Sequence, residues 1–337
     1  MNIFKIVTII SLFSLFSCYP KGNGYEYNQG SLPSIPVNLE EFNSVYDDYN
    51  STSPTLGRLI PFCFSTNRNS AGNNFDIIYR PMSVSFSKTT GILDVTNSYG
   101  GWGEYGEKFT VLSYGVGKMN TGGDDLGPYL LLNEINQFTD FKFLFLSATD
   151  VDGNFDINYT FNTDSSGFSE NEAVTFLNTE FNDLYPVFNP DFSKIYFCSD
   201  RENSTFNIFH TNINNSDEKL IDKLSDTSHH EIIKNSLISS NYDDKCPYIF
   251  DNMLVFVSNR PGGFGGFDLY YSLFENGEWT TPVNFGADIN TEFDEYRPIL
   301  FDEGVDYNKH MMVFSSNRPE GKGGFDLYFV GAEHTKY

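Results

Sequence analysis

The sequence predicts an all-β protein, a five-bladed β-propeller of four-stranded antiparallel blades. The first observation is a repeated phrase, "FVSNRPGGFGGFDLYYS" at 256–272 and "FSSNRPEGKGGFDLYFV" at 314–330. The second is that weaker copies of its parts, such as "FCFSTNR" and "IYFCSDR", precede both. The third is that the repeated runs are short, rich in aromatic and β-branched residues, and bounded by turn residues, which is typical of strands. Repeats of this length indicate an array of similar units.

Each unit contains a Pro-led strand, an apolar strand ending near Ser-Asn-Arg, a Gly or Asn turn, and a Phe-Asp strand. A fourth strand is predicted at "EWTTPVNFG", residues 278–286, after "FDLYYS". Four antiparallel strands per unit describe a propeller blade, whereas unrelated hairpins in a sandwich would not repeat the same order of phrases. The gaps between the leading prolines are 74, 58, 61 and 51 residues, which favours five blades over six. These prolines are Pro54, Pro128, Pro186, Pro247 and Pro298.

The two ends of the predicted propeller complement each other. The last unit stops without a fourth strand, and "IPVNLEEF" at 35–42 echoes "TPVNFGADI" at 281–289. We therefore expect the N-terminal segment to supply the outer strand of the last blade, which closes the ring and removes open sheet edges. The predicted propeller covers residues 34–337, with an unassigned insertion near 80–120.

The N-terminus has the pattern of a targeting segment. Lys5 precedes an apolar run from Ile6 to Phe16, which is too short to span a bilayer and suits a signal peptide. The run ends in "LFSC", which resembles the lipobox of bacterial lipoproteins. The resemblance implies a signal peptide over 1–18 and lipid on Cys18; the alternative is an ordinary secretory signal that contains a cysteine. Residues 19–33, rich in Gly and Pro, are then expected to be a flexible tether.

Net charge and cysteine content limit the kinds of partner and site that the chain is expected to have. The chain has 21 basic and 45 acidic residues, a net charge of −24, and such a surface repels phosphate backbones, so nucleic acid is not an expected partner. If Cys18 is lipidated, three cysteines remain, which excludes a full disulfide framework. The spacing of cysteines and histidines predicts no zinc site.

The phrases "SNRPGGFGGFDLY", "WTTPVNFG" and "INTEFDE" resemble the WD-repeat-like propeller repeats of TolB and its relatives, most closely the lipoprotein and OmpA-linked versions common in Bacteroidota. The resemblance is strong over 240–330 and weak before 160. It implies a non-enzymatic, membrane-tethered module that binds a protein or another envelope component, with an OmpA-like or peptidoglycan-associated partner. It also implies a lipid anchor in the outer membrane. The sequence "YPKGN" after Cys18 lacks the acidic cluster that resembles a surface-export signal, so the periplasmic side is favoured.

Charged residues recur at fixed positions of the repeat. A position filled alike in most blades indicates a structural role, and a charge-assisted hydrogen bond from Arg to a turn carboxylate would hold a tight loop. We therefore expect no catalytic and no cofactor-binding residue among them, and no cofactor. The arginines are Arg68, Arg201, Arg260 and Arg318; the Phe-Asp strands begin at Asp76, Asp156, Asp268 and Asp326; a third position holds Asp125, Asp183, Asp244 and Glu295.

One stretch offers a candidate metal site. Asp150, Asp152, Asn154 and Asp156 alternate in "DVDGNFD", and oxygen ligands at every second residue suggest a calcium loop. However, Gly153 is fourth rather than sixth, and the twelfth position is Phe161 rather than Glu. We therefore expect no metal site but keep these four residues as a candidate.

An alternative function remains open at the level of sequence. A propeller hydrolase acting on envelope or extracellular glycans or peptides would gather carboxylates from distant blades at the axis. An axial pocket with carboxyl groups in different environments would indicate a hydrolase. A broad, shallow face carrying residues of the 80–120 segment would indicate a binding module.

Overall fold

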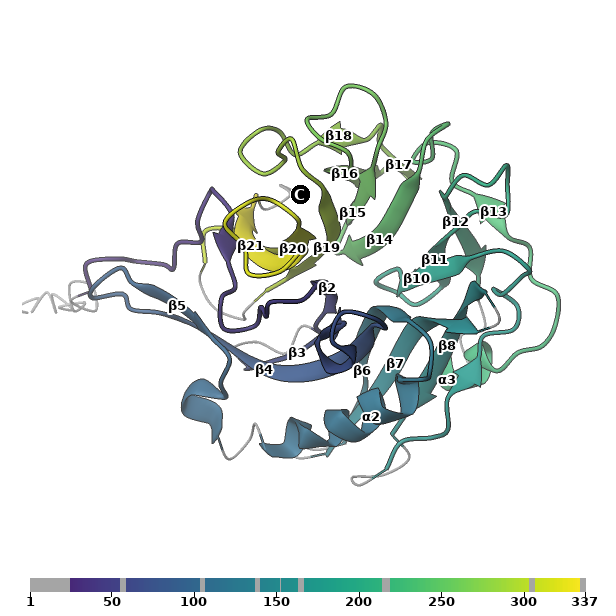
Figure 1. The fold of residues 1–337 in the computed structure, drawn as a ribbon, viewed down its shortest axis with the longest axis horizontal. Coiled ribbons are helices and arrows are strands. Elements are labelled where there is room, and N and C mark those ends of the chain that lie inside the picture. Colours follow the sequence, from purple (N-terminus) through teal and green to yellow (C-terminus); the bar gives the residue numbers. More distant parts are fainter. Residues whose placement is uncertain are drawn as a thin grey trace, which may run out of the picture.

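Five antiparallel sheets surround a common axis in the computed structural model, and the predicted five-bladed propeller is confirmed (Figure 1). The structure describes residues 25–54, 59–103, 107–136, 140–151, 153–162, 167–213, 219–302 and 307–333. The innermost strands of the blades, β2, β6, β10, β14 and β19, are neighbours around the ring. Blade 1 contains β2 (Asp48–Thr52), β3 (Leu59–Thr66), β4 (Asp76–Phe86) and β5 (Leu93–Thr96).

The next three blades follow in chain order, each numbered from the axis outward. Blade 2 contains β6 (Asp125–Asn136), β7 (Asp140–Val151), β8 (Asn154–Phe161) and β9 (Glu172–Ala173). Blade 3 contains β10 (Asp183–Phe188), β11 (Lys194–Ser199), β12 (Asn207–Asn212) and β13 (Ile233–Lys234). Blade 4 contains β14 (Asp244–Phe250), β15 (Met253–Ser258) and β16 (Asp268–Glu275), with both β17 (Glu278–Trp279) and β18 (Val283–Asn284) pairing with β16.

Blade 5 is completed by the other end of the chain, as predicted. Its strands β19 (Glu295–Phe301), β20 (His310–Ser316) and β21 (Asp326–Ala332) are followed outward by β1 (Val37–Asn38). Val37 pairs with Phe329 and Asn38 with Tyr328. This pairing covers the edge of β21, which would otherwise expose unpaired backbone groups.

The packing extends further toward the N-terminus than expected. Residues 25–33 fall in the segment that the sequence assigned to a flexible tether. Leu32 is buried in the main core, and its backbone N–H donates to Asn308. The N–H of Gly331 donates to the carbonyl of Pro33 at 2.8 Å, and Tyr27 packs edge-on against Phe86. Residues 27–33 are therefore packed on the propeller rather than part of a tether.

The unassigned insertion contains the main helix of the fold. The elements η2 (Gly100–Trp102), η3 (Glu107–Val111) and α2 (Leu112–Met119) connect blades 1 and 2, and a shorter helix, α3 (Leu220–Leu224), precedes β13. Val116 and Met119 of α2 join a second buried cluster with Ile77 of β4 and Phe145 of β7. The insertion fills the wedge between two blades, at the periphery rather than at the axis (Figure 1).

One repeat unit was misaligned from the sequence. Pro54 was expected to lead blade 1, as Pro128 leads blade 2, but the equivalent residue in β2 is Ser51. The pair Asp47-Asp48 marks the start of blade 1, because Asp48 has the position of the acidic residues that begin the other inner strands. Asp48 is therefore a fifth member of the acidic set Asp125, Asp183, Asp244 and Glu295, and the sequence alone did not identify it.

Candidate functional site

Each inner strand has a bulge with one residue in the left-handed region, and these five residues meet at the propeller axis. The register shifts at this point in every blade. Left-handed backbone is unfavourable for residues other than Gly, so packing must hold it in place. The five residues, with φ between 48° and 60°, are Asn50, Gly127, Tyr185, Cys246 and Arg297.

Arg297 fills the axis. It is fully buried, its Nη1 donates to the carbonyl of Pro247 at 3.2 Å, and its Nη2 donates to the carbonyl of Pro128 at 3.1 Å. Its guanidinium also lies 5.1 Å from the ring centre of Tyr185. Groups from blades 2, 3, 4 and 5 are thus joined through one side chain at the axis.

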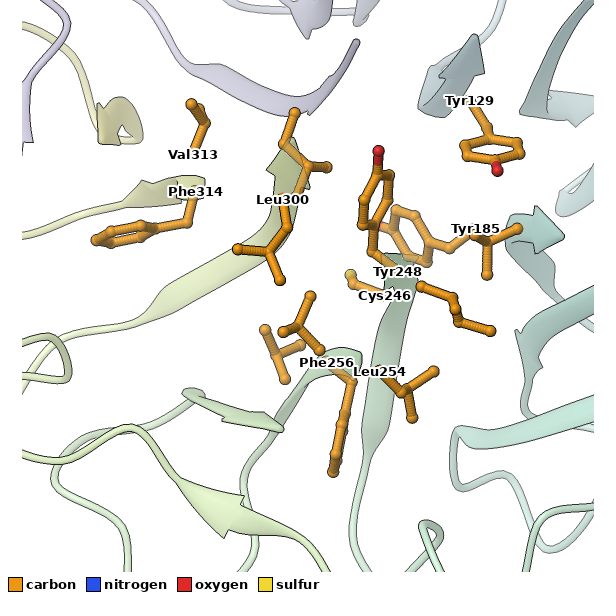
Figure 2. Packing of buried hydrophobic residues seen from close by; sticks show 14 of the residues in the cluster. Tyr129, Tyr185, Cys246, Tyr248, Leu254, Phe256, Leu300, Val313 and Phe314 are labelled. Atoms are coloured by element: carbon orange, nitrogen blue, oxygen red, sulfur yellow. The ribbon is translucent and has the colours of Figure 1, made fainter. Parts of the chain in front are cut away.

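An axial pocket lies at the end of the ring where the inner strands finish, and Arg297 is not among its lining residues. Its volume is about 240 Å³. Tyr129, Phe188 and Tyr248 form an aromatic wall, in which the ring of Tyr129 is 6.1 Å from each of the other two (Figure 2 shows Tyr129 and Tyr248). Phe250 and Asp251 line the rim at the turn between β14 and β15.

A second carboxyl group, that of Asp302, lies at the same end of the axis. The Asp302 carboxylate is 2.6 Å from Nδ1 of His310, and the His310 ring packs edge-on against Phe250 at 5.0 Å. Phe250 lines the pocket whereas His310 and Asp302 do not, so this pair lies behind the Phe250 ring. Asp251 is exposed and Asp302 is half-buried, so both carboxylates reach solvent at one end of the axis.

The recurring arginines pair with the acidic residues that begin the inner strands, and we call each such pair a blade latch. In blade 4, Arg260 donates to Asp244 at 2.5 Å, to Ser258 through Nε, and to the carbonyl of Ile238. The carboxylate is fully buried, so the ion pair also satisfies a charge that water does not reach. The other latches are Arg68–Asp48, Arg201–Asp183 and Arg318–Glu295.

The second recurring set, the aspartates of the Phe-Asp strands, lies at a different place. Asp268 accepts from the backbone N–H groups of Phe264 and Gly265, and Asp326 accepts from those of Lys322 and Gly323. These two carboxylates hold the Gly-rich turns. Asp76 accepts from the Asn69 side chain, and blade 3 has Asn207 at this position.

Blade 2 has no latch arginine. Asp125 is fully buried and accepts from Thr121 and Thr149, but Val151 occupies the repeat position of the arginines. Burial raises the pKa of Asp125 to about 6, against the lowering effect of its hydrogen bonds with these two threonines.

The calcium candidates are occupied with other contacts where they are described. Asp150 accepts from the N–H of Gly153, and the Asn154 amide donates to the carbonyls of Thr179 and Phe181. Asp152 lies outside the described residues. Within the described ranges no three acidic, His or Cys side chains form a group that could hold a metal ion. Cys18 and the whole 1–18 segment also lie outside the described residues, and no described helix is long and apolar enough to cross a membrane.

Comparison with known proteins supports the fold more than any family. No protein-family model and no curated protein matches the sequence. An endo-arabinase from Bacteroides thetaiotaomicron matches 89% of this chain and 99% of its own, with a TM-score of 0.50 at 13% identity. An α-L-arabinofuranosidase from Podospora anserina, solved with cellotriose, matches 91% and 97%, with a TM-score of 0.50 at 10% identity. A putative TolB from Agrobacterium tumefaciens matches 78% and 80%, with a TM-score of only 0.38 at 10% identity.

These findings correct the main functional expectation. We expected a non-enzymatic binding module, and that expectation was wrong: the matching solved structures are mainly glycoside hydrolases, which agrees with the alternative. At these identities the likeness itself shows only the five-bladed fold.

Sequence reasoning missed the residues of the axial pocket. Tyr129, Phe188 and Tyr248 belong to three different blades, and each lies in an apolar run typical of any inner strand. The available signal was the residue before each leading proline, since Gly127, Tyr185, Cys246 and Arg297 all stand there. That position differs from blade to blade, whereas a purely structural repeat position would be uniform.

Proposed function

We propose that the protein is a propeller hydrolase that acts on glycans and binds one sugar residue in the axial pocket. The observation that carries this proposal is the aromatic wall of Tyr129, Phe188 and Tyr248 beside the exposed carboxylate of Asp251. Aromatic faces are weakly negative and pack well against the C–H faces of sugar rings. A pocket of about 240 Å³ is below the usual range for drug-sized ligands and suits a single ring.

Asp251 and Asp302 are the carboxyl groups that we assign to the reaction. Glycoside hydrolysis uses two such groups: one protonates the leaving oxygen as the C–O bond breaks, and the other activates water or attacks the anomeric carbon. The buried carboxylates of the four latches are already paired with arginines at the opposite ends of the inner strands. Asp251 lies instead at the pocket rim, and Asp302 lies at the same end of the axis, next to His310; both reach solvent.

The test is hydrolysis by the purified protein of oligosaccharides from arabinan, xylan and cellulose, the glycans suggested by the names of the structural neighbours. Asp251→Asn and Asp302→Asn should each lower kcat by roughly 10²-fold or more, the usual contribution of acid–base catalysis. Glu278→Gln, on the exposed outer strand of blade 4, is the matched control and should retain activity. Activity that survives in both Asp variants would remove these residues from the mechanism.

We also infer that the chain is anchored in the outer membrane, on its periplasmic side, by lipid on Cys18. The apolar run from Ile6 to Phe16 and the small Ser17 before Cys18 support this inference. Mass spectrometry of the mature N-terminus should detect a diacylglycerol-modified Cys18. Cys18→Ala protein that still fractionates with membranes and resists release by salt would contradict the anchor.

A further inference from the structure

A second pocket lies where blades 3 and 4 meet, and we call it the junction pocket. Its volume is about 460 Å³, and its lining includes Lys234 of β13, residues of the loop before β14, and Arg260. Arg260 forms the latch with Asp244 at the start of β14, whereas Asp251 of the axial pocket follows the end of that strand. The two pockets therefore lie at opposite ends of β14.

The loop between neighbouring blades is fixed by one side chain that bonds to the backbone of the third strand. At the junction of blades 3 and 4 this side chain is Ser239, whose hydroxyl accepts from the N–H of Ile208 and donates to its carbonyl. At the other four junctions an asparagine makes the same two bonds through its longer amide. These pairs are Asn43 with Leu327, Asn120 with Ile77, Asn178 with Ile157, and Asn290 with Leu269.

In blades 4 and 5 a second asparagine completes this contact. Asn290 donates to Asn284 of β18 at 2.8 Å, and blade 5 has the equivalent pair Asn43 and Asn38. Blade 3 has Lys234 at the position of Asn284, because both stand opposite the strand residue that follows the bonded one. The amide bridge is thus absent from blade 3, and the two residues that replace it, Ser239 and Lys234, both line the junction pocket.

A third member of the network is also replaced in blade 3. Asn284 donates to Asp268 in blade 4, but blade 3 has Asn207 at the position of Asp268. Asn207 is buried, and its Oδ1 accepts no hydrogen bond from the described residues. Buried polar groups are normally satisfied, so the loss of this network at one junction needs a reason beyond the stability of the blade.

The lining of the junction pocket is positively charged. Lys234 and Arg260 both line it and no acidic residue of the described chain does, although the chain has 45 acidic residues. The charge of Arg260 is balanced by the buried Asp244, so Lys234 supplies the available charge. The ion-pair partner of Lys234 is the exposed Glu202, at 3.3 Å. Such a solvent-exposed pair is weak, so a ligand anion can take the place of Glu202.

The same lining has neutral groups that suit a sugar. Tyr242 is 45% exposed, and an aromatic face packs well against the C–H face of a sugar ring. The side chains of Ser236, Asn241 and Tyr242 have no hydrogen-bond partner among the described residues, so they are available to hydroxyl groups of a ligand. The pocket volume is within the usual range for small-molecule sites.

We propose that the junction pocket is a second ligand site, which binds a sugar residue whose carboxylate or sulfate group lies beside Lys234. Arg260, held in place by its latch, donates to the same ligand. The proposal goes beyond hydrolysis at the axial pocket and does not depend on it.

The test is isothermal titration calorimetry of the full chain with D-glucuronate and D-glucose 6-sulfate, with D-glucose as the neutral control. We expect each anionic sugar to bind at least about 10-fold more tightly than glucose, as for one charge-assisted hydrogen bond. The preference should shrink in about 0.5 M NaCl, because salt screens exposed charges.

Two variants restore the asparagines of the other blades. Lys234→Asn removes the charge, and Ser239→Asn places an amide in the pocket that can make the backbone bonds seen at four junctions. Both should lose the preference for anionic sugars while keeping a cooperative thermal transition. Lys118→Asn is the matched control, since it removes a lysine from another exposed ion pair, and it should keep the preference.

The outcomes decide the proposal without reference to the axial pocket. Equal binding of glucose and the anionic sugars overturns it, and so does a preference that persists in Lys234→Asn. N-acetyl-L-glutamate bound as tightly as D-glucuronate would show a site for an acidic peptide side chain, which overturns the assignment to a sugar. Lys234→Asn decides even if Ser239→Asn does not fold. The proposed hydrolysis is tested separately by Asp251→Asn and Asp302→Asn.

Discussion

Blades 5 and 2 both depart from the repeat, in opposite ways. Blade 5 takes its outer strand from the distant N-terminal segment but keeps a complete latch between Arg318 and Glu295. Blade 2 is formed by one continuous stretch, 125–173, but has no latch arginine beside Asp125. Both still form four-stranded sheets with the same bulge in the inner strand. A blade can therefore form without a continuous chain, as blade 5 does, and without a buried ion pair, as blade 2 does.

The largest expected effect comes from removing the borrowed strand of blade 5. A chain that begins at residue 44 lacks β1 and also loses the buried side chains of Leu32, Leu39 and Phe42. At about 1.5–3 kcal/mol for each buried apolar side chain, the free energy of unfolding should fall by roughly 5–8 kcal/mol. Guanidinium denaturation would measure this loss, and the exposed edge of β21 should promote self-association.

Val37→Ala is the control for that truncation. Val37 is 43% exposed although it pairs with Phe329, so its side chain contributes little, and the change should stay within about 0.5 kcal/mol. A chain starting at residue 44 with an unchanged denaturation midpoint would show that blade 5 does not need its borrowed strand.

The next effect tests the latch of blade 5. Arg318→Met leaves the fully buried carboxylate of Glu295 without its cation, and breaking a buried ion pair from one side costs about 3–5 kcal/mol. The double variant Arg318→Met/Glu295→Gln should recover a large part of this loss, because no charge is then left unpaired. Urea unfolding at pH 7 measures both. A double variant no more stable than Arg318→Met would mean that the arginine contributes through packing alone.

The smallest effect concerns Asp125 in blade 2, where the substitution should stabilise the protein instead of destabilising it. Its pKa in the folded protein is about 6, above about 3.9 in the unfolded chain, so the folded state binds the proton more tightly. The wild-type protein therefore loses stability as pH rises from about 4 to 6, and the loss persists above pH 6. Asp125→Asn removes that loss and should be about 1–2 kcal/mol more stable than wild type at pH 8.

At pH 4 the same Asp125→Asn variant should show little or no gain, since the wild-type carboxyl is already protonated in the folded protein. Unfolding curves at pH 4 and pH 8 give the comparison directly. A difference that is independent of pH would show that charge on Asp125 is not the cause.

The periphery of the blades could be predicted from the sequence, because each blade needs the same contacts there. The phrase ending in Ser-Asn-Arg recurs since Ser258 and Arg260 act within one latch, and Ser316 and Arg318 do the same. The pairing of β1 with β21 could be predicted because a missing strand at one end matched a surplus one at the other. Pro54 misled the alignment of blade 1, since proline is tolerated at several positions of a loop.

The axis could not be predicted in the same way. Asn50, Tyr185, Cys246 and Arg297 share a backbone conformation but no chemistry, and their neighbours come from other blades. The Asn50 amide donates to the Tyr185 hydroxyl across 135 residues of sequence, and Arg297 reaches Pro128 across 169. Such contacts form only after the ring closes, so no local sequence pattern predicts the axial pocket or the buried arginine at the axis.

The closure of blade 5 also constrains the order of folding. Val37 pairs with Phe329, a separation of 329 − 37 = 292 residues. During synthesis, β1 therefore leaves the ribosome long before its partner exists. Contacts so distant in sequence slow folding, because loop-closure entropy is lost before the contact forms. Blades 1 to 4 are complete before that point, whereas the ring can join only after translation has passed β21. Until then, the edge of β21 lacks the strand that covers it in the finished ring.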